Sequence, residues 1–122
     1  MRRFFIIFFA LFCLNSYAKQ EQIVLSPKGP VINRDGLPLY FDIPVVYYDD
    51  DPKSPEIIID GGGAVSYYDV EITSAVTNMV EISTQVDGTY DTFSVSSLTA
   101  GQHVITIESP SGNIYEGTFT TY

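Results

Sequence analysis

The chain has 122 residues, of which 15 are Asp or Glu and six are Lys or Arg, so its formal net charge is −9 at pH 7. This charge argues against nucleic acid as a partner, because the attraction that drives nonspecific binding to phosphates would have the wrong sign. The length suits one domain with a single core.

The N-terminal segment reads MRRFFIIFFALFCLNSYAKQ and has the three parts of a secretory signal peptide. Arg2 and Arg3 supply the positive start, residues 4–14 are apolar, and Ser16-Tyr17-Ala18 fits the small-x-small rule for the peptidase. About 11 apolar residues are too few for a membrane-spanning helix, which needs roughly 20. We therefore expect residues 1–18 to be cleaved after Ala18 and the protein to reach the periplasm, the cell surface or the medium.

The alternative at this end is a lipoprotein in which Cys13 carries the lipid, although Phe12 stands where a lipobox needs a small residue. With cleavage after Ala18, residues 19–122 form a single domain that keeps four basic residues against 15 acidic ones. That domain has no cysteine, so its stability has to come from its core and not from disulfides. We expect no membrane span after cleavage.

From residue 19 onward the apolar residues recur with period two, and Gly, Pro, Asn and Asp interrupt them. No stretch has the period of an amphipathic helix. We expect the segments Lys19–Gln22 and Gly29–Gly36 to fray. The upstream strands are expected at Ile23–Ser26, roughly Leu39–Tyr48, Glu56–Asp60 and Val65–Thr73.

The stretch MVEISTQVDGTYDTFSVS, residues 79–96, predicts a first hairpin. Asp87-Gly88 is favoured in a two-residue type I′ turn, because both turn residues need a positive φ. Folding about this turn pairs residues whose numbers sum to 175, so that Ile82 faces Phe93. This register separates apolar from polar residues on both strands.

A second hairpin is predicted about Pro110-Ser111-Gly112, where Pro enters a type I turn and Gly takes the left-handed position. The residue numbers of its pairs sum to 222, so Ile107 faces Tyr115 and His103 faces Phe119. Together these short strands, spaced about 8–12 residues apart, predict an all-β fold: an antiparallel β-sandwich of about seven or eight strands.

Between the two expected hairpins the chain reads LTAGQH, residues 98–103. Immunoglobulin-like sandwiches often place Leu-x-x-Gly-x-Tyr here, where the leucine packs in the core and the tyrosine hydroxyl bonds back to the backbone. His103 holds the tyrosine position in this chain.

The sequence resembles a family of small exported immunoglobulin-like proteins from Bacteroides-type bacteria, catalogued as a domain of unknown function. The resemblance covers about residues 40–121. It implies an immunoglobulin-like sandwich of seven or eight strands, export, and no assigned chemistry. The residues that carry it are Ile57-Ile58-Ile59-Asp60-Gly61, Tyr68-x-Val70-x-Ile72, Phe93-Ser94-Val95-x-x-Leu98-x-x-Gly101, Ile105-Thr106-Ile107 and Gly112-Asn113-x-Tyr115-x-Gly117-x-Phe119.

The residue types disfavour most familiar catalytic designs, so we expect a protein that is not an enzyme and has no cofactor. His103 is the single histidine, and it falls on the expected inner face, where a packed histidine is the simpler interpretation than a Ser-His-Asp triad or a zinc ligand. Gly61-Gly62-Gly63 lacks the spacing, the lysine and the helix of a phosphate-binding loop, so a turn is expected there. A hydrolase based on two carboxylates remains open.

Tyrosines supply the candidate contact surface. The pairs Tyr47-Tyr48 and Tyr67-Tyr68 each place one ring on either face of a strand. The outer rings, Tyr47 and Tyr67, together with Tyr90, which is expected beside Gln85, are candidates for contact with a sugar or a peptide. Ordinary sheet surface is the alternative for all three tyrosines.

The stretch YYDDDPKSPE, residues 47–56, holds the densest negative charge. Asp49, Asp50 and Asp51 are weak candidates for a calcium site, with Asp42 or Asp60 as further donors from other loops. The EF-hand pattern is not met, because Lys53 and Ser54 occupy places that need Asp and Gly. The alternative is a solvated loop between two strands, ended by Pro52 and Pro55.

These observations predict an exported interaction module that binds a protein, a peptide or a glycan at the cell envelope. The alternative is a structural or accessory subunit of a surface assembly, joined by β-strand addition.

Overall fold

The computed structural model describes residues 20–29 and 41–122. The predicted signal peptide, Cys13, and those parts of the expected Gly29–Gly36 and Leu39–Tyr48 segments that fall in residues 30–40 lie outside the described residues. Within the described part of the chain, no helix is long and apolar enough to cross a bilayer.

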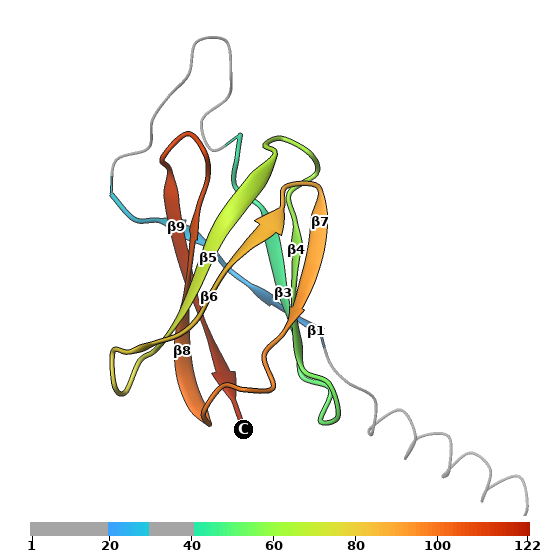
Figure 1. Cartoon of the computed structure of the whole chain (residues 1–122). Helices are drawn as coiled ribbons and strands as arrows, with labels where there is room; N and C mark the ends of the chain where they lie inside the picture. Colours follow the sequence, from blue (N-terminus) through green and yellow to red (C-terminus); the bar gives the residue numbers. More distant parts are fainter. Residues whose placement is uncertain (1–19, 30–40) are drawn as a thin grey trace, which may run out of the picture.

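The described residues form two antiparallel sheets packed face to face (Figure 1). The four-stranded sheet has the order β1-β3-β4-β7, and the five-stranded sheet has the order β2-β9-β8-β5-β6. The strands are β1 Gln20–Ile23, β2 Ser26–Pro27, β3 Val45–Asp49, β4 Glu56–Asp60, β5 Tyr67–Ser74, β6 Val80–Asp87, β7 Tyr90–Ser94, β8 Gly101–Glu108 and β9 Ile114–Thr121.

The core lies between the two sheets because alternate residues of each strand point inward. On β5, Tyr68, Val70 and Ile72 are buried, while Asp69 and Glu71 are exposed. The alternation predicted for this strand is therefore confirmed. The four-stranded sheet and β8 and β9 supply the rest of the core, which includes Val46, Tyr48, Ile57, Ile59, Ile105, Ile107 and Phe119.

The second predicted hairpin is confirmed residue for residue. Ile107 faces Tyr115 and His103 faces Phe119 across β8 and β9. Gly112 has a φ of 92°, the left-handed value expected of a three-residue loop of this kind.

The first predicted hairpin is wrong. Strand β6 pairs with β5, and β7 pairs with β4, so the two segments lie in different sheets and Ile82 faces Ile72 instead of Phe93. Neither Asp87 nor Gly88 has the positive φ that a type I′ turn requires. Gly88 serves close packing instead, because a Cβ there would overlap the carbonyl oxygen of Val65.

The N-terminal expectations need correction too. Gln20–Ile23 does not fray but pairs with β3 along its whole length, and the expected strand Ile23–Ser26 is divided between β1 and β2. Residues 41–44 are not in a strand, so β3 begins only at Val45. The expected strand Glu56–Asp60 is confirmed with its bounds.

Candidate functional site

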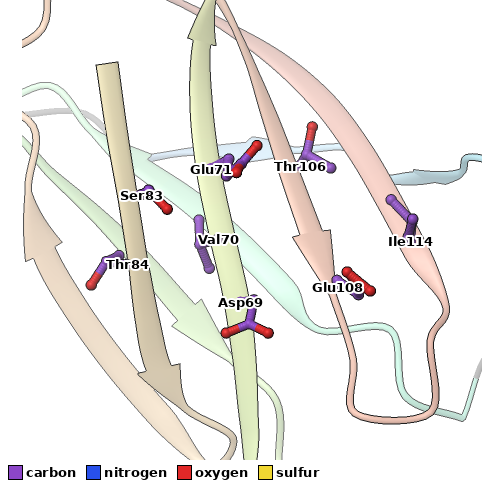
Figure 2. Close-up of a pocket in the computed structure, with 8 residues that line it drawn as sticks. All are labelled: Asp69, Val70, Glu71, Ser83, Thr84, Thr106, Glu108 and Ile114. Carbon is purple, nitrogen blue, oxygen red and sulfur yellow. The ribbon is translucent and has the colours of Figure 1, made fainter. Parts of the chain in front are cut away.

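A groove of about 470 Å³ runs over the outer face of the five-stranded sheet (Figure 2). We call it the acidic groove. Its lining residues come from four neighbouring strands: Asp69, Val70 and Glu71 of β5, Ser83 and Thr84 of β6, Thr106 and Glu108 of β8, and Ile114 of β9.

Strand alternation places the carboxylates of the acidic groove. Because Tyr68, Val70 and Ile72 fill the core, Asp69 and Glu71 have to point outward from β5. Glu108 points outward from β8 for the same reason. Figure 2 shows the three carboxylates projecting from these two adjacent strands.

The pairing of β5 with β8 brings two of these carboxylates together. Asp69 lies directly opposite Glu108, and Glu71 lies opposite Thr106. Residues opposite one another on one sheet face have Cβ atoms roughly 5 Å apart, and like charges in that position destabilise the sheet. The fold therefore retains a repulsion that a neutral residue at either position would remove.

Few groups in the described part of the chain offset this charge. The amide Nε2 of Gln85 donates to Oδ1 of Asp69 at 3.2 Å. The described residues include two basic side chains, Lys28 and Lys53, and neither lines the acidic groove. Lys28 lies 4.0 Å from Glu116, on β9 outside the groove lining.

A second carboxylate, Asp42, has the opposite environment, because it is fully buried at the end of the sandwich. Its side chain accepts hydrogen bonds from the hydroxyl groups of Ser109 at 2.5 Å and Ser111 at 2.6 Å and from the amide of Asn113 at 3.0 Å. It also accepts a short hydrogen bond from the hydroxyl of Tyr115. We call these five residues the Asp42 cluster.

The Asp42 cluster fixes the loop before β3 to the tip of the β8–β9 hairpin. Burial alone would raise the pKa of Asp42, but the hydrogen bonds from Ser109, Ser111, Tyr115 and Asn113 together outweigh it and hold the pKa below its ordinary value of 3.8. The hydroxyl of Tyr68 donates to the backbone carbonyl of Asp42 at 2.9 Å. Burial, with Asp42 nearby, raises the pKa of Tyr68 to about 12.

His103 occupies the sheet corner, as its sequence position predicts, and is fully buried. Its Nδ1 lies 3.0 Å from the carbonyl oxygen of Gly101, and its Nε2 lies 3.1 Å from Oε2 of Glu81. The backbone N–H of Thr99 donates to the same carboxylate and is the main reason that the pKa of Glu81 lies below its ordinary value of 4.5. Burial of the carboxylate acts the other way, and His103 adds to the lowering.

The three candidate contact tyrosines do not share one surface. Tyr47 lies on the outer face of the four-stranded sheet, opposite Ile58, and Tyr90 lies on the same face, opposite Asp60. Tyr90 is 57% exposed, as expected, but it is not beside Gln85, since β6 and β7 belong to different sheets. Tyr67 lies on the five-stranded sheet, opposite Asp87.

The centre of the acidic stretch, residues 50–55, is the loop between β3 and β4, as its prolines predicted, and Asp49 is the last residue of β3. Oδ1 of Asp49 accepts the backbone N–H of Asp51 at 3.2 Å, and Oδ1 of Asp51 accepts that of Lys53 at 3.0 Å. Asp42 is not available as an outside donor, because its carboxylate belongs to the Asp42 cluster. Among the described residues, no three His, Cys, Asp or Glu side chains are placed to share a metal ion.

No family model matches the chain, and no curated protein matches it. A solved structure is similar in fold: the crystal structure of a DUF3244 family protein from Bacteroides vulgatus, described as an immunoglobulin-like β-sandwich. The two superpose with a TM-score of 0.64 over 85% of this chain and 100% of the other, at 15% sequence identity. The chain has an immunoglobulin-like fold. The fold predicted from the sequence, and the resemblance to immunoglobulin-like proteins of unknown function, are thereby confirmed at the level of fold.

Proposed function

We propose that this immunoglobulin-like domain is a non-catalytic interaction module that binds a positively charged polypeptide segment in the acidic groove. The observation that carries the proposal is the meeting of Asp69, Glu71 and Glu108 on one sheet face, with no basic side chain among the groove residues. Such a face attracts cationic partners and repels anionic ones. We expect this interaction at the cell envelope, because residues 1–18 have the sequence pattern of a signal peptide.

The like-charge pair supports binding over a purely structural role. Asp69 and Glu108 repel each other in the free protein, and a cationic side chain between them would relieve that repulsion on binding. Retention of a locally unfavourable arrangement is typical of functional sites, where stability is given up for activity.

Titration of fluorescently labelled Lys- and Arg-rich peptides against the purified protein tests the proposal. We expect a variant with Asp69→Asn, Glu71→Gln and Glu108→Gln to bind about tenfold or more weakly, since each exposed ion pair contributes about 0.2–1 kcal/mol. The matched control removes the same charge from the other sheet by Asp49→Asn, Asp51→Asn and Glu56→Gln. Equal weakening by both variants would show that the affinity depends on net charge and not on the acidic groove, and would contradict the proposal.

A ligand of another class would give a different result. A neutral glycan bound on the face of Tyr47 and Tyr90 would survive the groove substitutions and high salt, and would be lost with Tyr90→Ala. Paired carboxylates also carry out acid–base hydrolysis when they stand roughly 5–10 Å apart. Cleavage of a chromogenic glycoside that Glu108→Gln abolishes would replace the binding proposal with an enzymatic one.

A second candidate function is favoured by the free edge of β6. The structural or accessory subunit predicted as the alternative would join its neighbour by strand addition, and β6 has a strand partner on one side only among the described residues. Concentration-dependent assembly of the purified protein, measured by sedimentation velocity and abolished by Ser83→Pro, would support this function over peptide binding.

A further inference from the structure

The outer edge of β6 is the longest strand edge that the described residues leave without a neighbour. Val80–Asp87 spans eight residues and has β5 as its one strand neighbour, and at its last residue the N–H of Asp87 donates to the carboxylate of Asp91 at 2.9 Å. An unpaired strand edge offers a row of backbone donors and acceptors to another extended chain. The start of this edge is also apolar, since Met79 is 67% and Val80 is 52% exposed.

The other edges offer less. The edge of β9 carries β2, and the N–H of Lys28 donates to the carbonyl of Ile114 at 2.8 Å. The edge strand β7 is five residues long, and the carboxylate of Asp91 accepts the N–H of Thr92 at 2.8 Å. The edge strand β1 is four residues long.

The acidic groove extends to β6, so the free edge and the carboxylates form one surface. Ser83 and Thr84 line the groove from β6 itself. Across the sheet, Ser83 faces Glu71, and Gln85 faces Asp69, which in turn faces Glu108. An additional strand on β6 would place its residues in line with these two rows.

We infer that the acidic groove and the edge of β6 together bind an extended segment that adds to the five-stranded sheet and carries Lys or Arg at alternate positions. This inference rests on the proposed function and specifies its partner. Residues i and i+2 of a strand lie on the same face about 6.6–7 Å apart, which is also the spacing between the two rows. A basic residue on an added strand, opposite Ser83, would lie about two strand spacings, or roughly 10 Å, from Glu71. Because the side chain of Ser83 is short, a long basic side chain can extend over it and reach Glu71.

Charge complementarity favours this occupant over a second copy of the chain. Two copies joined at β6 would bring two acidic faces side by side, and like charges across an interface disfavour the pairing. A segment with basic side chains would instead neutralise the charge while its backbone completes the hydrogen-bond ladder of β6.

The test compares three synthetic peptides of equal length and composition by fluorescence anisotropy with the purified protein. The first has Arg at alternate positions, the second has the same Arg residues moved to adjacent positions, and the third is the first with N-methyl groups on alternate backbone amides. We expect the second and third peptides to bind at least about fivefold more weakly than the first, because they lose the row alignment and the ladder hydrogen bonds respectively. Glu71→Gln should weaken binding of the first peptide about twofold to fivefold.

The N–H of Gly88 donates to the carbonyl of Ser66, so in this register the N–H of Thr84 faces β5 and that of Ser83 faces the free edge. The variant Ser83→Pro therefore removes a backbone donor from the free edge and adds an independent test on the protein side. If Ser83→Pro fails to fold, the N-methylated peptide still decides the question. Equal binding of all three peptides to the wild type, with loss in the triple groove variant, would overturn strand addition and leave the proposed function standing. Absence of binding by every cationic peptide would overturn both, and self-association through β6 would overturn the assigned occupant.

Discussion

Two groups of carboxylates in this protein have opposite surroundings. Asp42 is fully buried, and its side chain accepts hydrogen bonds from four residues of the β8–β9 hairpin region. The carboxylates of the acidic groove lie on an open sheet face, where Asp69 receives one hydrogen bond from Gln85 and faces Glu108. The donors of the Asp42 cluster stabilise the charge of Asp42, whereas among the described residues no basic side chain lines the acidic groove.

This difference separates a structural role from a binding role. A buried carboxylate is stable only when donors surround it, and removal of the acceptor costs the hydrogen bonds that those donors make to it. Carboxylates that repel one another on a surface do not strengthen the fold. The Asp42 cluster therefore maintains the geometry of the sandwich end, whereas the acidic groove is the surface for which we propose recognition.

The largest expected effect concerns the Asp42 cluster. Asp42→Ala should lower the free energy of unfolding by about 3–4 kcal/mol, because it removes the shared acceptor of four buried hydrogen bonds and leaves a cavity. Urea denaturation measures the loss, with Asp60→Asn as an exposed control expected to change stability by less than about 0.5 kcal/mol. A loss below about 1 kcal/mol for Asp42→Ala would contradict the structural role.

The next prediction concerns pH. The pKa of Asp42 is lowered in the folded protein, so its contribution to stability is fully present above the ordinary value of 3.8 and is lost as pH falls through the folded pKa. The stability difference between the wild type and Asp42→Asn should therefore shrink below about pH 4. Urea denaturation at a series of acidic pH values measures this difference, and a gap that stays constant or widens would show that the ionised form of Asp42 is not what the donors stabilise.

A smaller effect, of opposite sign, is expected in the acidic groove. Glu108→Gln should raise the free energy of unfolding by about 0.3–0.5 kcal/mol at low salt, because it removes the repulsion with Asp69. The gain should fall when salt is added. Glu21→Gln is the control, since Glu21 faces Tyr48 and not a carboxylate. Destabilisation by Glu108→Gln would mean that the groove carboxylates contribute to the fold.

The smallest effect is expected when calcium is added, because its candidate ligands are Asp49, Asp50 and Asp51 of the acidic stretch. Asp49 and Asp51 each use Oδ1 to accept a backbone N–H of this same stretch. Calcium at about 1 mM, a level that extracellular calcium modules bind, should therefore leave the melting temperature unchanged in the wild type and in Asp51→Asn. An increase in the wild type alone would restore the predicted calcium site.

Much of the fold could be predicted from period-two patterns, because local alternation decides which residues point inward. That pattern alone places Asp69, Glu71 and Glu108 on outer faces. It does not say which strands are neighbours, and the pairing of β5 with β8 joins segments that are distant in the sequence. The meeting of Asp69 with Glu108 could not be predicted for that reason.

The same limit explains why the first hairpin was predicted wrongly and why the Asp42 cluster was not predicted. Asp87-Gly88 has the local signal of a tight turn, but the packing of Gly88 against Val65 sends the chain across to the other sheet. A signal for the Asp42 cluster was present, since Ser109, Ser111 and Asn113 continue the inward face of β8 and β9 as polar residues. Their acceptor lies 67 residues or more away in the sequence, so the alternation showed the donors without showing Asp42.

The most direct test of the account is amide hydrogen exchange with and without the peptide that carries Arg at alternate positions. We expect new protection at Ser83 and Gln85 of β6, whose N–H groups face away from β5, chemical shift changes at Asp69, Glu71 and Glu108, and no change in the Asp42 cluster. Protection or shift changes centred on Tyr47 and Tyr90 of the other sheet, with β6 unaffected, would contradict it.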